Sequence, residues 1–420
     1  MLIVIKARKA SEPAKKPPKL KRKEKKMTEN DKIHYFDWAA TAPADEDILQ
    51  NALTQSLKIW GNPSSIHQSG KEAKEFLADA RKKAGEALGV NAENIYFTSG
   101  GTESDHIPLL AMLTRPVKGT ILVSSIEHPA LREQCQALKN LGWNIVSIPS
   151  NSDGIITPQA VESCCTKDTV LVCIMAVNNE TGAIQPVYEI ADKITELSQG
   201  RRRPKFHVDC VQAAGKIPIN LKYKGIDSAA FSAHKICGPR GIGILYCSYD
   251  INPFLRGGGQ EKNVRSGTEN LFGAKAMADC LERYIISDSN PKMQERFELQ
   301  KQWTAVFIEK LMTLGNCTMI PHSRKEAANA EKFSPWVVQA SFKNIPGQVM
   351  VRALSSNGFY ISTGSACSAK KQSRPILEAM HVSHEESETA VRFSFGCHTT
   401  KQAMDELFEQ VRQICADFSK

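Results

Sequence analysis

The 420-residue sequence lacks any apolar run long enough to cross a membrane. Its longest runs, such as residues 170–177, fall far short of the roughly 20 residues that a membrane helix needs. Internal repeats are also absent, and low complexity is confined to the N-terminal end. Hydrophobic residues make up 41% and charged residues 24%, which excludes a mainly disordered, collagen-like or coiled-coil chain. At roughly 100–200 residues per domain, we expect two or three domains, or one large and one small.

Cysteine spacing excludes other classes. None of the twelve cysteines forms a CxxC pair, which argues against a zinc ribbon or a thioredoxin-like site, and we expect no metal site. No secretory signal precedes them, which argues against a disulfide framework. We therefore expect a cytoplasmic, reducing location with mostly buried thiols. The open question is whether one of them is a nucleophile.

The net charge of +9 comes from one end of the chain. Residues 1–26 hold 11 basic and 2 acidic residues, whereas residues 27–420 hold 43 of each. This tail has no apolar periodicity and is predicted to be disordered. It could contact nucleic acid or an acidic surface or direct nuclear import. Alternatively, it is a solvated tail, or an extension upstream of a start at Met27.

The body alternates helical and strand patterns. Residues 45–60 and 71–88 have helical spacing, and Gly89 would end the second helix. Short apolar runs separated by helical stretches predict an α/β fold with a mostly parallel sheet covered on both faces. Strands are expected at 95–98, 120–124, 144–148, 170–177, 206–209 and 228–232, with an antiparallel member at 242–247, and a helix at about 293–312 should lead into a smaller α+β unit.

The first chemical motif is the stretch FTSGGTES at 97–104. Gly100 and Gly101 let the backbone approach an anion, and free N–H groups at the helix start near Thr102 can hold a phosphate. Alone, such a turn is as often simply a tight turn.

Two further motifs place charged residues at strand ends. Asp209, ending the run FHVD, could pair with the protonated ring nitrogen of a ligand that Gln212 could also reach, or it could be a helix N-cap. Lys235, preceded by Ser232 and His234, would lie at the carboxyl edge of the sheet, where α/β proteins bind ligands. A partly desolvated lysine has a lowered pKa and can form a Schiff base with an aldehyde; the alternative is a surface lysine. A phosphate cradle, an aspartate and such a lysine together fit pyridoxal 5'-phosphate.

The chain from about residue 34 to 418 resembles the class V aminotransferase family, specifically the cysteine desulfurases of the NifS/IscS type. Ten stretches carry this resemblance in order: YFDWAATAP (35–43), GNPSSIH (61–67), FTSGGTES (97–104), EH (127–128), VNNETG (177–182), HVDCVQ (207–212), SAHKICGPRGIG (232–243), GGGQEKNVRSGTEN (257–270), STGSACS (362–368) and VRFSFG (391–396). It implies the type I fold of pyridoxal-phosphate enzymes, with a mostly parallel seven-stranded sheet. It further implies a large domain at 45–292 and a small α+β domain at 27–44 and 293–420.

The resemblance assigns roles to individual residues. Lys235 would carry the cofactor, Asp209 would pair with its ring nitrogen, and His128 would stack on the ring. Arg392 would bind the substrate carboxylate as a bidentate donor. Further cofactor contacts would come from Gly101, Thr102, Asn179, Gln212, Ser232, His234 and Thr268; Asn179 would also contact substrate, and Thr268 would reach the other subunit's phosphate in a homodimer.

Cys367 is the predicted nucleophile, because it lies in a polar, glycine-bearing stretch where the family has its catalytic cysteine. The implied reaction converts L-cysteine to L-alanine, with Lys235 as base, and leaves a persulfide on Cys367. An acceptor, such as an iron–sulfur scaffold protein or a tRNA-thiolation partner, would then take the sulfur.

Two other interpretations stay open. A selenocysteine lyase shares the same lysine, aspartate and cysteine pattern. A non-catalytic nucleic-acid or scaffold-binding protein on this fold would use the basic tail instead. The sequence also departs from the family pattern: Trp38 stands at a usually polar position, residues 105–108 include Pro108, which could shorten or bend a helix, and residues 370–374 make the loop after Cys367 basic.

Overall fold

The computed structural model describes residues 34–364 and 373–418. The basic tail and Cys367 lie outside these residues. Among the helices described, none is both long and apolar enough to span a membrane.

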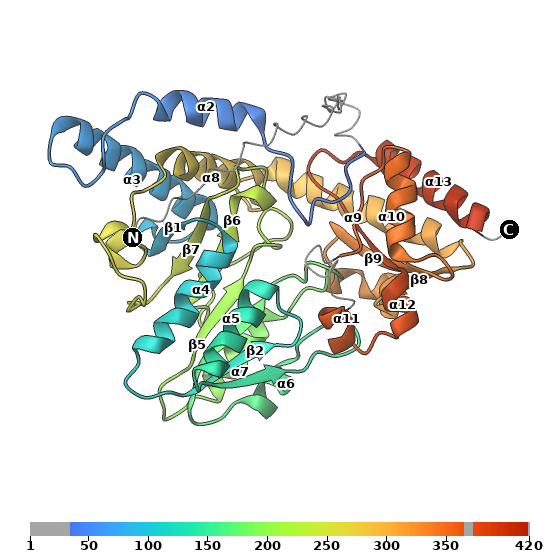
Figure 1. Ribbon diagram of the computed structural model, residues 1–420, viewed down its shortest axis with the longest axis horizontal. Helices are drawn as coiled ribbons and strands as arrows, with labels where there is room; N and C mark the ends of the chain where they lie inside the picture. Colours follow the sequence, from blue (N-terminus) through green and yellow to red (C-terminus); the bar gives the residue numbers. More distant parts are fainter. Residues whose placement is uncertain (1–33, 365–372, 419–420) are drawn as a thin grey trace, which may run out of the picture.

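The larger of the two units of the molecule is built around a seven-stranded sheet (Figure 1). Its strand order is β1-β7-β6-β5-β4-β2-β3. β7 is antiparallel to both of its neighbours, β1 and β6, and the remaining pairs are parallel. The mostly parallel sheet with one antiparallel member is therefore confirmed. The strands are β1 Ile95–Thr98, β2 Thr120–Ser124, β3 Asn144–Ile148, β4 Thr169–Met175, β5 Lys205–Asp209, β6 Ser228–Ser232 and β7 Gly243–Cys247.

Helices cover this sheet, as expected for βα units. α4 packs against β5, β6 and β7, and α3 packs against α8, which also contacts α2. Core strands β2 and β6 are buried along their whole length, because helices shield both faces. The helices are α2 Glu46–Ser56, α3 Gln68–Leu88, α4 Gly101–Ala111, α5 Pro129–Asn140, α6 Pro158–Cys164, α7 Val187–Glu196 and α8 Leu271–Tyr284, with short 3₁₀ turns that include η3 Ala233–Lys235 and η4 Gln260–Asn263.

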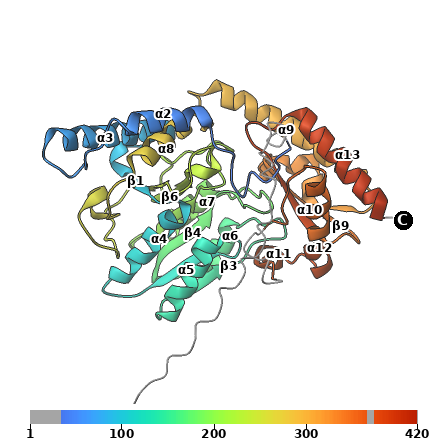
Figure 2. The same cartoon turned by 45° about the horizontal axis from the view of Figure 1, so that its top comes forward.

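A second, antiparallel sheet has the order β10-β9-β8 and its own hydrophobic core (Figure 2). Phe307, Phe342 and Phe393 meet edge to face within that core. The N-terminal segment joins this unit, because Tyr35 bridges to Tyr360 and Asp37 to Ser394. Its elements are α9 Pro291–Met312, β8 Cys317–Ile320, β9 Val337–Phe342, α10 Gly347–Ser356, α11 Pro375–Ala379, α12 His384–Thr389, β10 Ala390–Ser394 and α13 Lys401–Phe418.

Two helix ends show how local chemistry sets the boundaries. Gly89 ends α3 in the left-handed conformation (φ 68°), as predicted, because glycine adopts that conformation without steric cost. α2 is shorter than the sequence pattern indicates: it ends at Ser56, and Leu57 and Trp60 are exposed. Pro108 lies inside α4, which ends three residues later and continues as a 3₁₀ turn.

Candidate active site

Five segments predicted to carry chemistry leave the same edge of the large sheet. Strands β1, β2, β4, β5 and β6 all run in one direction, so their carboxyl ends share that edge. Asp209 is the last residue of β5, and Lys235 lies three residues beyond β6. Gly100, His128 and Asn179 follow β1, β2 and β4. The topology therefore brings together residues that are up to 135 positions apart, as open α/β sheets do at their ligand sites.

The Lys235 amine is held by backbone carbonyls of the N-terminal segment. Its Nζ donates to the oxygens of Ala39 (2.6 Å) and Ala40 (2.8 Å). Burial, reinforced by the nearby Arg392 guanidinium, lowers the pKa of Lys235 to about 8. Both effects disfavour the ammonium form, so a useful fraction of this amine is neutral near pH 7.

Asp209 is buried beside that amine. Burial raises the pKa of Asp209 to about 8, and the carboxylate of Asp105 adds to the rise, whereas Lys235 opposes it. Its Oδ1 accepts a hydrogen bond from the Val211 N–H at 2.8 Å. A carboxyl in such a setting ionises when a cation lies against it, and Lys235 and Asp209 are close enough to influence each other's pKa. Both residues lie at the carboxyl ends of neighbouring parallel strands, at the same edge of the sheet.

A buried hydrogen-bond network, which the sequence analysis missed, lies close to Asp209 along β5. His207, two residues earlier on β5, contacts Asp105 Oδ1 through Nε2 (3.1 Å) and Ser228 through Nδ1 (2.9 Å). All three side chains are buried. The only available signal was the odd combination of a histidine within an apolar strand and an aspartate on the first turns of α4.

Gln212 is anchored on the same backbone as Lys235. Its Nε2 donates to the Ala39 carbonyl at 2.8 Å, and its Oε1 accepts from the buried amine of Lys216 at 2.5 Å. Burial and the neighbouring Lys235 charge keep the pKa of Lys216 well below its usual range. Gln212 and Lys235 thus donate to the same carbonyl, that of Ala39, while the predicted contact of Gln212 with a ligand stays a prediction; Lys216 was not anticipated.

The glycine turn before α4 permits close packing. A Cβ on Gly101 would lie 2.6 Å from a methyl group of Val211, and a Cβ on Gly100 would lie 3.8 Å from Ser232 Oγ. Ser232 therefore borders the start of α4, where Thr102 is exposed. The first N–H groups of this eleven-residue helix have no partner within the helix, and such groups attract an anion.

The two predicted histidines are uncharged at neutral pH. His234 contacts Thr41 Oγ1 through Nδ1 (3.1 Å), and burial with the adjacent Lys235 charge lowers its pKa to about 4. His128 caps α5 by accepting the Ala130 N–H, and crowding of its ring by protein lowers its pKa as well. The His128 side chain is nevertheless exposed, so one face of a neutral ring is available for stacking.

Arg392 reaches the site from β10 of the smaller sheet. Its guanidinium donates to Asp37 Oδ1 (2.7 Å) and to the carbonyls of Asn179 and Gly364 (both 2.8 Å). Two buried polar atoms here have no hydrogen-bond partner among residues 34–364 and 373–418: Arg392 Nε and Asn179 Oδ1. Buried polar groups are nearly always paired in folded proteins, so these atoms point to a ligand. Asp37 was another residue that the sequence analysis missed.

The remaining predicted residues are not part of this cluster as described. Thr268 is exposed in the loop between η4 and α8. Cys367 lies outside the described residues, so its role stays a prediction. Among the cysteines that the structure describes, eight are buried and Cys164, Cys165 and Cys397 are partly exposed, which confirms the expectation of mostly buried thiols over these ranges. Cys210, beside Asp209, is buried, and this raises the pKa of its thiol well above the usual range.

These residues fit pyridoxal 5'-phosphate. The orphaned Asn179 Oδ1 and Arg392 Nε, the desolvated Lys235 amine and the buried Asp209 supply complementary groups for its aldehyde, its ring and a substrate carboxylate. The start of α4, where Thr102 is exposed, offers N–H groups without a partner within the helix to the phosphate.

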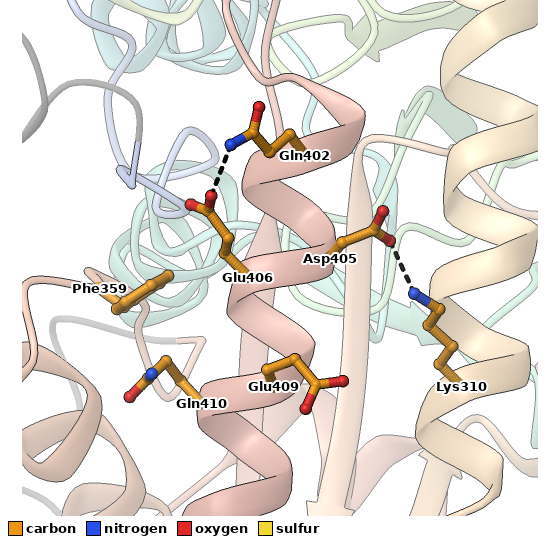
Figure 3. A pocket seen from close by; sticks show the side chains of 7 residues that line it. All are labelled: Lys310, Phe359, Gln402, Asp405, Glu406, Glu409 and Gln410. Carbon is orange, nitrogen blue, oxygen red and sulfur yellow. Dashed lines mark hydrogen bonds and ion pairs between the residues drawn. The ribbon is translucent and has the colours of Figure 1, made fainter.

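A separate cavity of about 460 Å³ lies on the outer face of α13 (Figure 3). Glu406, Glu409 and Asp405 line it, together with Lys310, which pairs with Asp405 at 2.8 Å. None of the residues predicted for the active site borders this cavity.

Residues 34–407 match the aminotransferase class-V family, so the chain belongs to that family. Among relatives, it is 36% identical to a NifS/IcsS protein homolog of Lactobacillus delbrueckii subsp. bulgaricus, over 92% of this chain and 98% of the relative. It is also 36% identical to the cysteine desulfurase IscS of Methanosarcina thermophila, over 92% and 93% of the two chains. Among solved structures, a NifS-like protein superposes with a TM-score of 0.81 at 33% identity, covering 91% of this chain and 99% of that one. The predicted fold class and family are confirmed.

Proposed function

We propose that this protein is a pyridoxal-phosphate-dependent cysteine desulfurase, converting L-cysteine to L-alanine and passing sulfur through Cys367 to an acceptor protein. The observation that carries the proposal is that a desolvated Lys235 amine and a buried Asp209 lie at one sheet edge, together with a buried Arg392 whose Nε has no hydrogen-bond partner among the described residues. The similarity to proteins named cysteine desulfurase supports the choice within the family.

The cofactor would be held by residues at the carboxyl edge of the larger sheet. Lys235 would bind its aldehyde, Asp209 its ring nitrogen and His128 its ring face, and further contacts would come from Gly101, Thr102, Asn179, Gln212, Ser232 and His234. When bound, pyridoxal phosphate supplies an electron-withdrawing ring that stabilises negative charge on the substrate α-carbon.

The protein's own side chains handle charge and protons. Arg392 would exchange one of its carbonyl contacts for the substrate carboxylate, because a planar guanidinium binds carboxylates with two parallel hydrogen bonds. Lys235, with a pKa of about 8, would accept the α-proton near neutral pH. Neutral His128 adds no positive charge that would compete with Asp209 for the ring nitrogen.

Cys367 would receive the sulfur. Its thiolate would attack the substrate Sγ, forming an S–S bond while the substrate Cβ–Sγ bond breaks. The carbon skeleton then takes up protons and leaves as alanine, and Cys367 carries a persulfide. No external oxidant is consumed, because the electron pair of the broken Cβ–Sγ bond stays with the carbon skeleton, which is reduced as the two sulfurs are oxidised to the persulfide level.

A homodimer is part of this proposal. Thr268 is exposed within a single chain, which is consistent with a contact to a second subunit's cofactor phosphate. Exposed apolar side chains offer surface for association: Trp60 is 81% and Ile66 92% exposed, and Leu255 is 64% exposed. A large domain at 45–292, a small domain at 27–44 plus 293–420, a cytoplasmic location and an iron–sulfur scaffold as acceptor complete the proposal.

Two variants of the holoenzyme test the function. Lys235→Ala should lose the yellow chromophore and all turnover, because the covalent anchor is gone. Cys367→Ser should keep the chromophore and release no sulfide from L-cysteine. Mass spectrometry should find a sulfur adduct on the Cys367 peptide after cysteine treatment, and Cys164→Ser provides a control thiol outside the site.

Four outcomes would overturn the proposal. Activity retained by Lys235→Ala would exclude the assigned anchor, and persulfide formation abolished by Cys210→Ser but not by Cys367→Ser would exclude the nucleophile. Negligible turnover of L-cysteine beside fast turnover of L-selenocysteine would indicate a selenocysteine lyase instead. A colourless wild-type protein whose nucleic-acid binding falls steeply with salt would support the non-catalytic alternative.

A further inference from the structure

Two thiols and an imidazole meet at the junction of the two sheets. Cys237 lies two residues after Lys235, and Cys397 and His398 follow β10. The two Sγ atoms are 3.5 Å apart, and the ligand atoms of all three residues lie within 4.8 Å of one another. No local motif marks this cluster, because Cys237 and Cys397 are 160 positions apart in the chain.

The spacing of these atoms matches a tetrahedral soft-metal site. Zinc binds thiolates at about 2.3 Å, which in a tetrahedron places two sulfurs about 3.8 Å apart, close to the observed separation. Two cysteines and one histidine are an established ligand set for zinc, with the fourth position left to water. Thiolates also select against hard cations such as Mg²⁺ and Ca²⁺.

The backbone fixes the buried half of the cluster. Cys237 has φ 63°, a left-handed conformation that is unfavourable for a residue with a side chain. Its carbonyl accepts the Asp45 N–H at 2.8 Å, which holds the strained turn in place. A strained backbone that aims a thiol at a second thiol is typical of a position kept for function rather than for packing alone.

The other half of the cluster is accessible to an incoming ion. Cys397 is partly exposed and His398 is exposed, whereas Cys237 is 2% exposed. Arg296 holds the loop by donating to the carbonyls of Gly396 (3.0 Å) and Thr399 (2.8 Å) on either side of these ligands. An ion would therefore enter from the side of the exposed His398, and the buried Cys237 would form the inner end of the site.

We propose that Cys237, Cys397 and His398 bind one thiophilic divalent cation of the zinc type. Binding forms two metal–sulfur bonds and one metal–nitrogen bond, releases the two thiol protons, and keeps one water as the fourth ligand, with no change in oxidation state. The ion would tie the turn after Lys235 to the loop after Arg392, so it would fix the two segments that carry those side chains relative to each other.

The experiment loads reduced holoenzyme with zinc(II), removes free metal by gel filtration, and measures bound zinc by elemental analysis. Wild type should retain about one ion per chain, and Cys237→Ser/Cys397→Ser at most about a tenth of that. The matched control is Cys164→Ser/Cys165→Ser, which removes two partly exposed thiols that are adjacent in the sequence and lie outside the cluster. This control should bind zinc like wild type. Cobalt(II) should add visible ligand-field bands, at longer wavelength than the cofactor, in wild type and the control only.

A third variant guards against misfolding of the double mutant. His398→Ala changes an exposed side chain and leaves both thiols, so it should fold and weaken zinc binding by about tenfold or more. Zinc should raise the Tm of wild type and leave that of Cys237→Ser/Cys397→Ser unchanged.

The proposal is overturned if wild type retains no zinc after gel filtration, or if the double variant retains as much as wild type. It is also overturned if Cys237 and Cys397 form a disulfide in air, seen as the loss of two hydrogens in the linked peptides, and the re-reduced protein still fails to bind zinc. Neither result depends on turnover, so a failed desulfurase assay would leave this test intact.

Discussion

The lowered pKa of Lys235 predicts how the rate at which the proposed cofactor, pyridoxal phosphate, adds to the protein depends on pH. Only a neutral amine adds to an aldehyde. At pH 7 a pKa of about 8 leaves roughly a tenth of the amines neutral, whereas the ordinary value of 10.5 would leave about three in ten thousand. Burial therefore raises the reactive fraction by a factor of roughly 300.

The assay follows the absorbance of pyridoxal phosphate added to cofactor-depleted protein between pH 6 and 10. Each rate constant is divided by the rate constant that the neutral amine of a free lysine derivative shows at the same pH. This division removes the effect of the aldehyde's own ionisation on the rate. Below about pH 8 the corrected rate should rise about tenfold per pH unit, and above it the rate should level off. A rate that keeps rising beyond about pH 9.5 would show an ordinary lysine and refute the reasoning.

Neighbouring charges supply the controls. Arg392 lowers the pKa of Lys235, so Arg392→Gln should move the plateau to higher pH. Asp209 raises that pKa and itself titrates near 8, so Asp209→Asn should keep a plateau and move it to lower pH. A plateau that disappears in Asp209→Asn would show that the carboxyl, and not the amine, sets the profile.

Three substitutions probe packing, each measured by urea unfolding and cofactor retention. Gly101→Ala would place a Cβ 2.6 Å from a valine methyl, so it should weaken cofactor retention by disturbing the helix start. Gly396→Ala would place a Cβ 2.0 Å from the Trp38 ring and should cost about 1–3 kcal/mol, and a second change of Trp38→Ala should recover part of it. Arg81→Ala should cost about 3–5 kcal/mol, because it strands the Glu261 carboxylate, which is 1% exposed; a loss below about 1 kcal/mol would contradict this.

The strands were predictable because each is a short apolar run with a sharp end. β1, β2, β3 and β6 have the predicted bounds; serine follows β1 and β2, and proline follows β3. The end of α2 was not predictable in the same way. Leu57 and Trp60 continue the helical spacing, but in a single chain no element covers them, so the pattern alone overstates the helix.

The site was predictable only where a motif is local. Lys235, Asp209 and Gln212 lie at strand ends that the sequence marks, and the fold brings them together. Asp37 could not be found, because its partner Arg392 is 355 residues away and belongs to the other sheet. Long-range ion pairs of this kind leave no periodic trace in the sequence.

One short segment explains why both sheets contribute to a single site. Asp37 pairs with Arg392 and bridges to Ser394, while the carbonyls of Ala39 and Ala40 hold the Lys235 amine. Trp38, between them, packs against the glycine that follows β10, at a distance that only a residue without Cβ allows. The residue that departs from the family pattern is therefore a buried contact between the N-terminal segment and the smaller sheet. Any movement of the smaller sheet relative to the larger one would therefore change the positions of Arg392 and of the carbonyls that hold Lys235 at the same time.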